Sequence, residues 1–537
     1  MKTFARNRAV VIALVLVALS TFWATVWRAP LGRDNWFLEP ARRDLWPLSS
    51  WVFPIAVLLI CGAFAWVCAY DRFRRAKTAR EQRTSTCMTL GALVVLATVW
   101  PWSLLGPLGG FQLVAAMWSD VSNQYFSTAY RVESARQFSI EYSKYQQDVE
   151  VSKAHVATHP PGAVLLFYGA KKVYDGVPPI RQFWEHFAPA FTDASTDSVG
   201  VETRRIVRRA TGENITLPDE AIPLALWSAF LLSLSTGLTV PAVYKLARGD
   251  CADETEADRR GLFAATLFAL APTAALFAFT LDAPMAFLVA WSLVFWANRQ
   301  RMGNRFAGVA SGAILGLASW ISFGALAIWG LIIFATALCW GARSLITTPV
   351  LVMSDFVARR KPAVHRPASD LALLLLGFAL FWTAILLIFP TPIVEIYSRA
   401  MEVHKMATLT SRSHGGWMLL NLFVFALFCG WPLVLGVLKQ LHRVLDVRVL
   451  EERRARHWNA ARALGVAAAA LCVGLSFAGT VRGETERLWL FLLAPLCALA
   501  AVEYAKCDKK TVALLAIFTA IQTLVLAGTL APLVRPY

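Results

Sequence analysis

Four segments that lie far apart in this 537-residue chain carry the polar side chains that could do chemistry. They contain Asp120, the motif Thr158-His159-Pro160-Pro161-Gly162, Asp282, and the run from Arg482 to Arg487. Carboxylates and imidazoles can take or give a proton, and an arginine can grip a phosphate through two parallel hydrogen bonds. If the apolar runs between them are membrane crossings, all four segments fall on one side of the bilayer. We therefore expect an active site at a boundary between lipid and water.

Asp120 follows the third apolar run and is surrounded by aromatic and short polar residues, among them Asn123 and Tyr125. Partial burial near the bilayer would raise its pKa and suit it to remove a proton from an acceptor hydroxyl. The alternative is an aspartate that only caps the following helix. Asn123 and Tyr125 are the neighbours we expect to contact substrate.

His159 and Asp282 each allow two interpretations, one as a functional residue and one as a structural residue. Two prolines after His159 fix the entry angle of a short helix and would hold the imidazole at the headgroup level, although a solvent-facing histidine fits the same pattern. Asp282 stands between two apolar runs with almost no loop. Because ionisable groups at membrane depth are costly, it indicates function. It could equally cap the next helix, with Pro284 in the first turn.

The run from Arg482 to Arg487 also contains Glu484 and Glu486 and precedes an apolar helix. Arg482 and Arg487 could hold a phosphate, and an outward-pointing helix N-terminus would add attraction for the anion. The alternative is a turn of solvated ion pairs. We predict that Arg487, Arg482 and Glu484 bind substrate.

The elements that position these residues are long and apolar. The chain is 57% hydrophobic and only 16% charged, against roughly 25% charged in soluble proteins. Repeated apolar stretches of 18 or more residues predict an all-α polytopic membrane protein with about thirteen transmembrane helices and exclude a soluble enzyme. The predicted spans are 9–28, 51–70, 88–108, 221–247, 261–280, 283–298, 305–321, 323–341, 371–390, 417–438, 461–480, 487–504 and 511–531.

Basic loops set the predicted orientation. Arginines and lysines cluster in 71–83, 299–305, 359–361, 439–456 and 506–510. With the amino terminus inside, all five loops are cytoplasmic, as the positive-inside rule requires. Anionic headgroups then explain the net charge of +17, so we expect membrane lipids and no nucleic acid as partners. This scheme holds only if residues 163–175, about 20 Å of helix, lie on the membrane surface, because they are too short to cross it.

Three parts follow from this scheme. Residues 1–87 form an appended N-terminal hairpin of two helices, the first a retained helix rather than a signal peptide. Residues 88–340 form the catalytic transmembrane module, with a large external loop at 109–220 that carries short surface helices. Residues 341–537 supply the C-terminal helices and an external loop at 391–416. The nine cysteines show no disulfide framework.

Taken in order, these motifs resemble the GT-C superfamily of polytopic glycosyltransferases, in particular the branch of protein O-mannosyltransferases and lipid A aminoarabinose transferases. The likeness covers residues 88–340, from Asp120 through His159-Pro160-Pro161-Gly162 and Asp282 to the glycine-rich segment 308–318. The resemblance implies a GT-C-like fold, Asp120 as the base or as a carboxylate of the acceptor site, Asp282 in the same pocket, and Arg487 on the donor phosphate. Where that branch often has a lysine, this chain reads Ser319-Trp320-Ile321-Ser322-Phe323.

The expected activity is an inverting transfer of a sugar from a polyprenyl-phosphate donor to a lipid, glycan or protein acceptor. The site would face the outside or periplasm of an inner or plasma membrane. No cofactor is required by the pattern. A role for a divalent metal stays open, and no ligand set for it is identified.

Two alternative functions stay open as well. One is an oligosaccharide ligase or polymerase of the cell envelope that uses His155, His159 and the arginines of 204–209. The other is a transporter or flippase of lipid-linked sugars.

Overall fold

The computed structural model describes the following residues: 2–23, 31–33, 36–38, 51–74, 78–105, 109–148, 156–192, 196–211, 217–249, 251, 253–340, 367–445 and 459–530. The described chain is helical apart from one short antiparallel pair, in which β1 (Leu31–Arg33) lies against β2 (Trp36–Leu38). The expectation of an all-α architecture is thus confirmed in its main point. The predicted basic loop 359–361 and most of the loop 439–456 fall outside the described residues.

Longer stretches separate α1 from α2, α15 from α17 and α20 from α22, and connections of a few residues join most of the helices. Their bounds are α1 Lys2–Phe22, α2 Val52–Arg74, α3 Ala79–Ser103, α4 Gly109–Trp118, α5 Asp120–Arg131, α6 Ala135–Asp148, η5 Val156–Thr158, α7 Gly162–Gly176, α8 Pro178–Thr192, α9 Thr196–Thr211, α10 Ala221–Arg248, α11 Glu254–Leu270, α12 Pro272–Leu276, α13 Asp282–Met302, α14 Arg305–Ile321, η6 Phe323–Leu326, α15 Ala327–Trp340, α17 Pro367–Ile388, α18 Ile393–His404, η7 Lys405–Leu409, α19 His414–Cys429, α20 Trp431–Leu445, α22 Ala460–Ala478, α23 Thr485–Leu488, η8 Leu490–Leu492, α24 Leu493–Tyr504 and α25 Lys509–Thr529.

Six of the described helices are long and apolar enough to cross a membrane: Val52–Ala69, Ala79–Ser103, Ala221–Arg248, Ala368–Ile388, Ala460–Ala478 and Lys509–Thr529. A seventh candidate is the pair α19 and α20, which is bent by 117° at its break. Four further apolar helices are shorter: Val10–Phe22, Arg305–Ile321, Phe323–Cys339 and Leu490–Tyr504. A multi-pass membrane protein fits these helices, but the predicted number of about thirteen spans is not confirmed.

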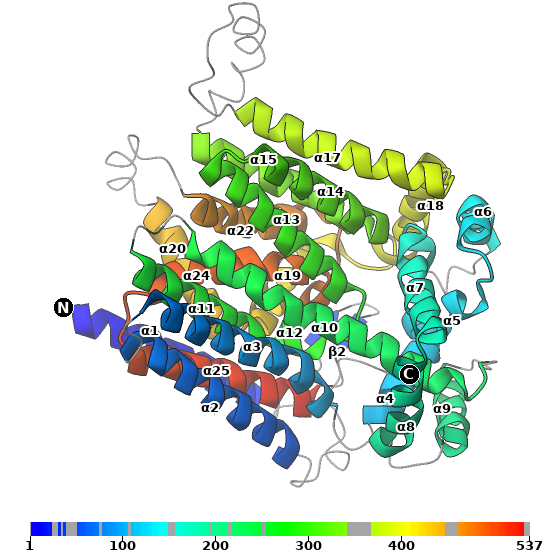
Figure 1. The fold of residues 1–537 in the computed structure, drawn as a ribbon, viewed down its shortest axis with the longest axis horizontal. Coiled ribbons are helices and arrows are strands. Elements are labelled where there is room, and N and C mark those ends of the chain that lie inside the picture. Colours follow the sequence, from blue (N-terminus) through cyan, green and yellow to red (C-terminus); the bar gives the residue numbers. More distant parts are fainter. Residues whose placement is uncertain are drawn as a thin grey trace, which may run out of the picture.

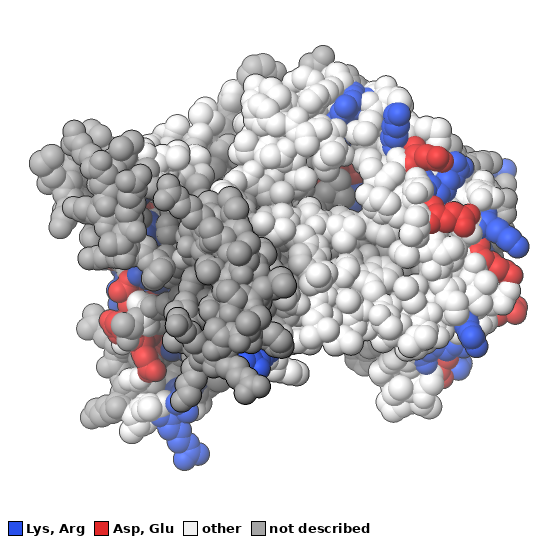
Figure 2. Space-filling view, turned by 90° about the horizontal axis from the view of Figure 1, so that it is seen from above, with Lys and Arg blue, Asp and Glu red and all other residues white. Residues whose placement is uncertain are grey.

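The long helices run side by side along one direction, and the short helices α4 to α9 gather at one end of them (Figure 1). Seen from above, most charged side chains lie toward the two ends of this long axis, and the described residues form a mostly uncharged belt between them (Figure 2). Such a belt is what a hydrocarbon layer requires, because an unpaired charge is costly there.

Polar contacts tie separate loops together at each end of the bundle. At the first end, Gln146 Nε2 donates to the carbonyl of Ile396 at 3.4 Å, and His404 Nε2 lies 2.8 Å from the carbonyl of Thr480. We call this the site end, because the four predicted polar segments reach it. At the opposite end, Arg248 pairs with Asp258 at 3.0 Å, at the far terminus of α10.

Helix α7 is the short helix on which the predicted topology depends. It has 15 residues and is not among the helices long enough to span a membrane. It packs against α5 and α10, and its first residue meets the end of α14. A Cβ on Gly162 would lie 2.1 Å from the carbonyl oxygen of Trp320, so only glycine permits this approach. The close contact gives the glycine of the His-Pro-Pro-Gly motif a packing role.

The first two helices pack separately on the bundle. Helix α2 lies along α3, whereas α1 lies against α25 and α20. The predicted division at residues 87 and 340 stays a prediction, since neither boundary is tested by these contacts.

Helices α13, α14 and α17 form a tightly packed unit. Arg299 of α13 and Asp370 of α17 make a buried ion pair of 2.6 Å. Gly312 of α14 and Gly377 of α17 allow the two backbones to touch: a Cβ on Gly312 would lie 1.8 Å from the carbonyl oxygen of Leu374. Small residues are the usual means by which membrane helices approach closely.

We predict that Gly312→Ala lowers the stability of the protein by about 1–3 kcal/mol, because the added methyl group has no space between α14 and α17. Gly330→Ala is the matched control, since a Cβ there meets nothing within 4 Å. Thermal unfolding of both variants in the same detergent checks this. A Gly312→Ala protein as stable as the control would contradict the packing.

Candidate functional site

The site begins at the turn between α22 and α23, whose backbone is unusual. Gly479 and Gly483 have φ of 64° and 90°, and Glu484 has φ of 61°. Among the described residues, Glu484 is the one non-glycine residue with positive φ. A non-glycine residue in this region costs about 1–3 kcal/mol, so surrounding contacts must hold it there.

Asn421 of α19 supplies many of those contacts. Its Nδ2 donates to the carbonyl of Val481 at 2.7 Å, and its Oδ1 accepts from the amide of Gly483 at 3.0 Å. Thr485 Oγ1 donates to the carbonyl of Asn421 at 3.0 Å. The buried side chain of Asn421 therefore forms hydrogen bonds with a backbone carbonyl and a backbone amide of the turn.

Arg412 and Arg482 brace the turn against the segment 405–414. Arg412 Nη1 donates to the carbonyl of Arg482 at 2.5 Å, and Arg482 Nη1 donates to the carbonyls of Leu409 at 2.6 Å and Arg412 at 2.5 Å. His414 Nε2 lies 2.9 Å from the carbonyl of Phe477. In this structure Arg482 therefore serves backbone carbonyls, and its predicted role in binding substrate stays a prediction.

An ionic chain then crosses the site. Arg487 Nη1 lies 3.1 Å from Asp282 Oδ2, and Arg487 Nη2 bonds Glu484. The other oxygen of Glu484 lies 3.2 Å from Arg412 Nη2. We call Asp282, Arg487, Glu484 and Arg412 the ionic chain. It joins α13 to two segments more than 100 residues later. Asp282 is buried, whereas the side chains of Arg412, Glu484 and Arg487 are partly exposed.

Asp282 does not act as the cap of α13. The N-cap position is Leu281, with no side-chain cap bond, and Asp282 is the first helical residue. It accepts from Thr280 Oγ1 at 3.2 Å in addition to Arg487. The structure thus does not support the capping alternative, and the predicted role of Asp282 in a site stays a prediction.

The groups of this turn and of the start of α13 lie outside the apolar stretches of the helices, and burial dominates their electrostatics. Burial raises the pKa of Asp282, although Arg487 opposes it. Burial raises the pKa of Glu486 to about 8. For Arg487, burial alone would lower the pKa, but Glu484 and Asp282 outweigh it and keep the guanidinium charged. Among the described residues, no three His, Cys, Asp or Glu side chains are arranged to hold a metal ion.

Tyr125 and His159 form a pair beside the ionic chain. Tyr125 Oη lies 2.9 Å from His159 Nδ1, and the carbonyl of His159 accepts a bond from Tyr142 at 2.9 Å. Burial raises the pKa of Tyr125, and the charges of Arg487, Asp282 and Glu484 also act on its hydroxyl. The pair therefore lies within electrostatic reach of the ionic chain.

Asp120 has its contacts on its own helix. Ser127 Oγ donates to Asp120, and Arg131 Nη1 lies 3.8 Å from it. About a quarter of the side chain is exposed, 27%. Asp282 and Glu484 thus both contact Arg487, Tyr125 and His159 contact each other, and Asp120 lies on the same helix as Tyr125. The side chain of Asn123 is outside the described part of the structure.

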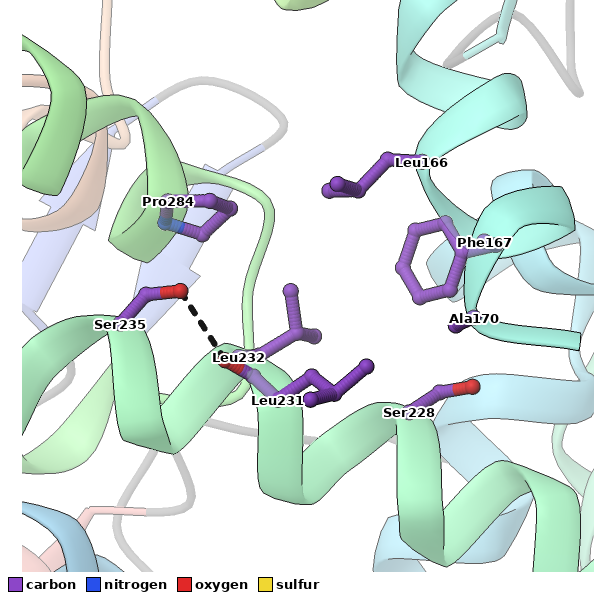
Figure 3. Close-up of a pocket in the computed structure, with 8 residues that line it drawn as sticks. All are labelled: Leu166, Phe167, Ala170, Ser228, Leu231, Leu232, Ser235 and Pro284. Carbon is purple, nitrogen blue, oxygen red and sulfur yellow. Dashed lines mark hydrogen bonds between the residues drawn. The ribbon is translucent and has the colours of Figure 1, made fainter. Parts of the chain in front are cut away.

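An apolar cavity adjoins the site. It is small, with a volume of about 60 Å³, and it lies between α7 and α10. Leu166 and Phe167 of α7 face Leu231 and Leu232 of α10 across it, with Pro284 at its rim (Figure 3). The ring of Phe167 lies parallel to that of Tyr125 at 6.4 Å, and Pro284 is two residues from Asp282. The cavity therefore shares Phe167 with the surroundings of Tyr125 and Pro284 with the first turn of α13.

Comparison with protein-family models, curated proteins and solved structures gives no match for this chain. The resemblance to GT-C enzymes accordingly stays a prediction.

Two site residues were not predicted from the sequence. Arg412 lies in a loop rich in charge, where nothing distinguished it. Asn421 had a signal, since it is a lone amide within the apolar run of α19.

We predict that Arg487→Met lowers the free energy of unfolding by about 2–4 kcal/mol, because it leaves the buried carboxylate of Asp282 without a cation. Asp282→Asn should lower it by about 1–2 kcal/mol, because Arg487 keeps Glu484 as a partner. The double variant should fall short of the summed losses by about 1–3 kcal/mol, since the two residues share one contact. Unfolding in mixed micelles measures the cycle.

The exposed pair of Arg205 and Glu202 is the control, and Arg205→Met should leave unfolding unchanged. Strict additivity of the Arg487 and Asp282 variants would show that the two side chains do not interact in the folded protein.

Proposed function

We propose that this protein is an integral membrane glycosyltransferase that moves a sugar from a polyprenyl-phosphate donor to an acceptor hydroxyl. One observation carries the proposal: Arg487, about three-quarters shielded from solvent, lies between two carboxylates at the end of a bundle of apolar helices. One of these carboxylates, Asp282, begins the helix whose Pro284 lines an apolar cavity. A ligand with a phosphate head and an isoprenoid tail matches this juxtaposition. A soluble nucleotide sugar would have no use for the apolar part.

Arg487 is the proposed contact of the donor phosphate. A guanidinium binds phosphate oxygens through parallel hydrogen bonds, and burial strengthens them. The phosphate would displace one of the two carboxylates that Arg487 contacts now. Asp282 then positions the guanidinium from the side of α13.

Asp120 is the proposed base. Its carboxylate is partly exposed, so an acceptor hydroxyl can reach it, whereas Asp282 is occupied by Arg487. Tyr125 stands five residues later on α5, which separates the two positions by about 8 Å along the helix axis. The acceptor would therefore approach from the side of Tyr125 and His159.

The reaction balances as a single displacement. Asp120 takes the proton of the acceptor hydroxyl while its oxygen attacks the anomeric carbon. The bond from that carbon to the phosphate oxygen breaks, and the lipid phosphate leaves with the electron pair. Attack opposite the leaving group inverts the anomeric centre. Since phosphate is already a good leaving group, positioning and charge stabilisation supply most of the catalysis.

We also propose the finer topology of about thirteen spans, with the site end facing the outside or periplasm of an inner or plasma membrane. The opposite end supports this orientation, because Arg301 lies in the last turn of α13, Lys506 between α24 and α25, and Lys509 at the start of α25. The positive-inside rule places such loops in the cytoplasm. The GT-C-like fold belongs to the same proposal.

We predict that proteoliposomes containing the protein transfer a labelled sugar from polyprenyl phosphate to an acceptor in a cell-envelope extract. Asp120→Asn and Arg487→Met should each lower the rate by about 100-fold or more, through loss of the base and of charge stabilisation. Glu254→Gln, at an exposed carboxylate of the opposite end, is the matched control. Transfer by Asp120→Asn at the rate of the control would exclude Asp120 as the base.

The orientation has its own test. In a chain with its cysteines replaced, Ser134→Cys at the site end should react with a membrane-impermeant maleimide added to intact cells. A variant that keeps only Cys251, at the opposite end, should react only after the cells are opened. The reverse pattern would place the site in the cytoplasm.

A further inference from the structure

Glu486 is a buried carboxyl group that the proposed reaction does not yet use. It is the second residue of α23, and only 2% of it is exposed. Its Oε2 is buried and has no hydrogen-bond partner among the described residues. Its carbonyl accepts from Thr273 Oγ1, which holds the backbone against α12. A buried polar atom without a partner is rare and calls for a ligand or a proton.

The neighbouring charges leave Glu486 poorly compensated. Two carboxylates, Glu484 and Asp282, and one cation, Arg487, act on it. Arg487 already serves both of those carboxylates. A third negative charge in this position would be buried without a dedicated cation, and a group in that situation takes up a proton instead.

The other elements around Glu486 add little charge. Helix α19 brings Asn421 and, at its start, His414, whose ring is bound to the carbonyl of Phe477. Helix α12 brings the hydroxyl of Thr273, and η8 consists of Leu490, Phe491 and Leu492. Arg412 pairs with Glu484, and Tyr125 of α5 is neutral because burial raises its pKa.

We propose that Glu486 is protonated at neutral pH and that its carboxyl group donates a hydrogen bond to an anionic phosphate group bound at Arg487. The site is thereby a combined proton and phosphate site. The identity of the phosphate as that of a lipid rests on the proposed function, whereas the protonation of Glu486 does not.

The electrostatics agree with this geometry. Burial raises the pKa of Glu486 to about 8; its own backbone amide and Arg487 oppose the rise, and Glu484 and Asp282 add to it. Below that pH the group is a neutral donor. Above it the group is an acceptor only, and it repels a phosphate.

The consequence for catalysis follows from the charge that develops. As the bond to the sugar breaks, the phosphodiester becomes a phosphomonoester and gains negative charge. A hydrogen-bond donor fixed beside that oxygen stabilises the transition state more than the ground state. Glu486 would thus complement Arg487, with no net proton transfer.

Binding of a radiolabelled dodecyl phosphate to the full chain in nanodiscs tests this between pH 7 and pH 9.5. In this range a phosphomonoester is already a dianion, since its second pKa is about 6. Affinity of the wild type should fall about tenfold for each pH unit above pH 8, as the donor proton is lost. Inorganic phosphate is the parallel probe: equal affinity would assign the site to free phosphate, and weaker affinity to a lipid phosphate.

Substitutions separate a donor from a base or a merely structural group. Glu486→Gln keeps a hydrogen-bond donor and cannot ionise, so it should bind dodecyl phosphate within about threefold of the wild type at pH 7 and lose the alkaline dependence. Glu486→Met should bind about tenfold more weakly at every pH. Glu484→Gln is the matched contrast in the same turn. It should not remove the alkaline dependence, because Glu484 is paired with two arginines.

Stability gives a readout that needs no ligand. A carboxyl whose pKa is raised from 4.5 to about 8 by folding binds more protons in the folded state, so the wild type should lose stability as the pH rises from about 4.5 to about 8. Glu486→Gln should lack this component.

Three results would overturn the proposal: loss of phosphate binding by Glu486→Gln at pH 7, alkaline weakening that persists in that variant, or no binding of either phosphate by the wild type. Absence of sugar transfer together with pH-dependent phosphate binding would instead reject the proposed function alone and leave the proton and phosphate site supported.

Discussion

The site depends on one guanidinium that two carboxylates share. Arg487 contacts Asp282 at the start of α13 and Glu484 in the strained turn before α23, so two parts of the chain about 200 residues apart meet at a single cation. A buried charge is tolerated only when it is paired, so the loss of one of these side chains would leave the charge of another without its partner. Arg412 extends the pairing to the segment that leads into α19. The left-handed backbone of Glu484 is held by these contacts.

The apolar helices explain why this cluster forms where it does. A chain with 16% charged residues has few places for a carboxylate, and the helix ends are the places where charge is tolerated. Arg299 and Asp370 show the same rule at the opposite end of α13, where a buried pair joins two helices. The glycines of α14 and α17 then allow close packing without any polar contribution. In this unit the ion pair joins α13 to α17, whereas the close backbone contact between α14 and α17 occurs at glycines elsewhere along the helices.

Much of the fold could be predicted from the sequence, because hydrophobic length and charge position are local properties. The lengths of α10, α17 and α25 follow from their apolar runs, and α7 is short because its run is short. The number of spans could not be settled in this way. Several apolar helices are under 18 residues or bent, as α19 and α20 are, and length alone does not separate a crossing from a re-entrant segment.

The sequence by itself predicted a multi-pass membrane protein, the residues that could do chemistry, and their position at one end of the helices, since each of these predictions depends on residue type and on counting apolar runs. Only the tertiary structure decided the partners. In the folded chain Asp282 pairs with Arg487, and Arg482 donates hydrogen bonds to backbone carbonyls. Arg412 and Asn421, from a segment without a predicted motif, also contact this turn. The physical reason is that pairing depends on side-chain geometry across helices distant in sequence. Whether a carboxyl is neutral or charged depends on burial, and for Glu486 burial exists only in the folded chain.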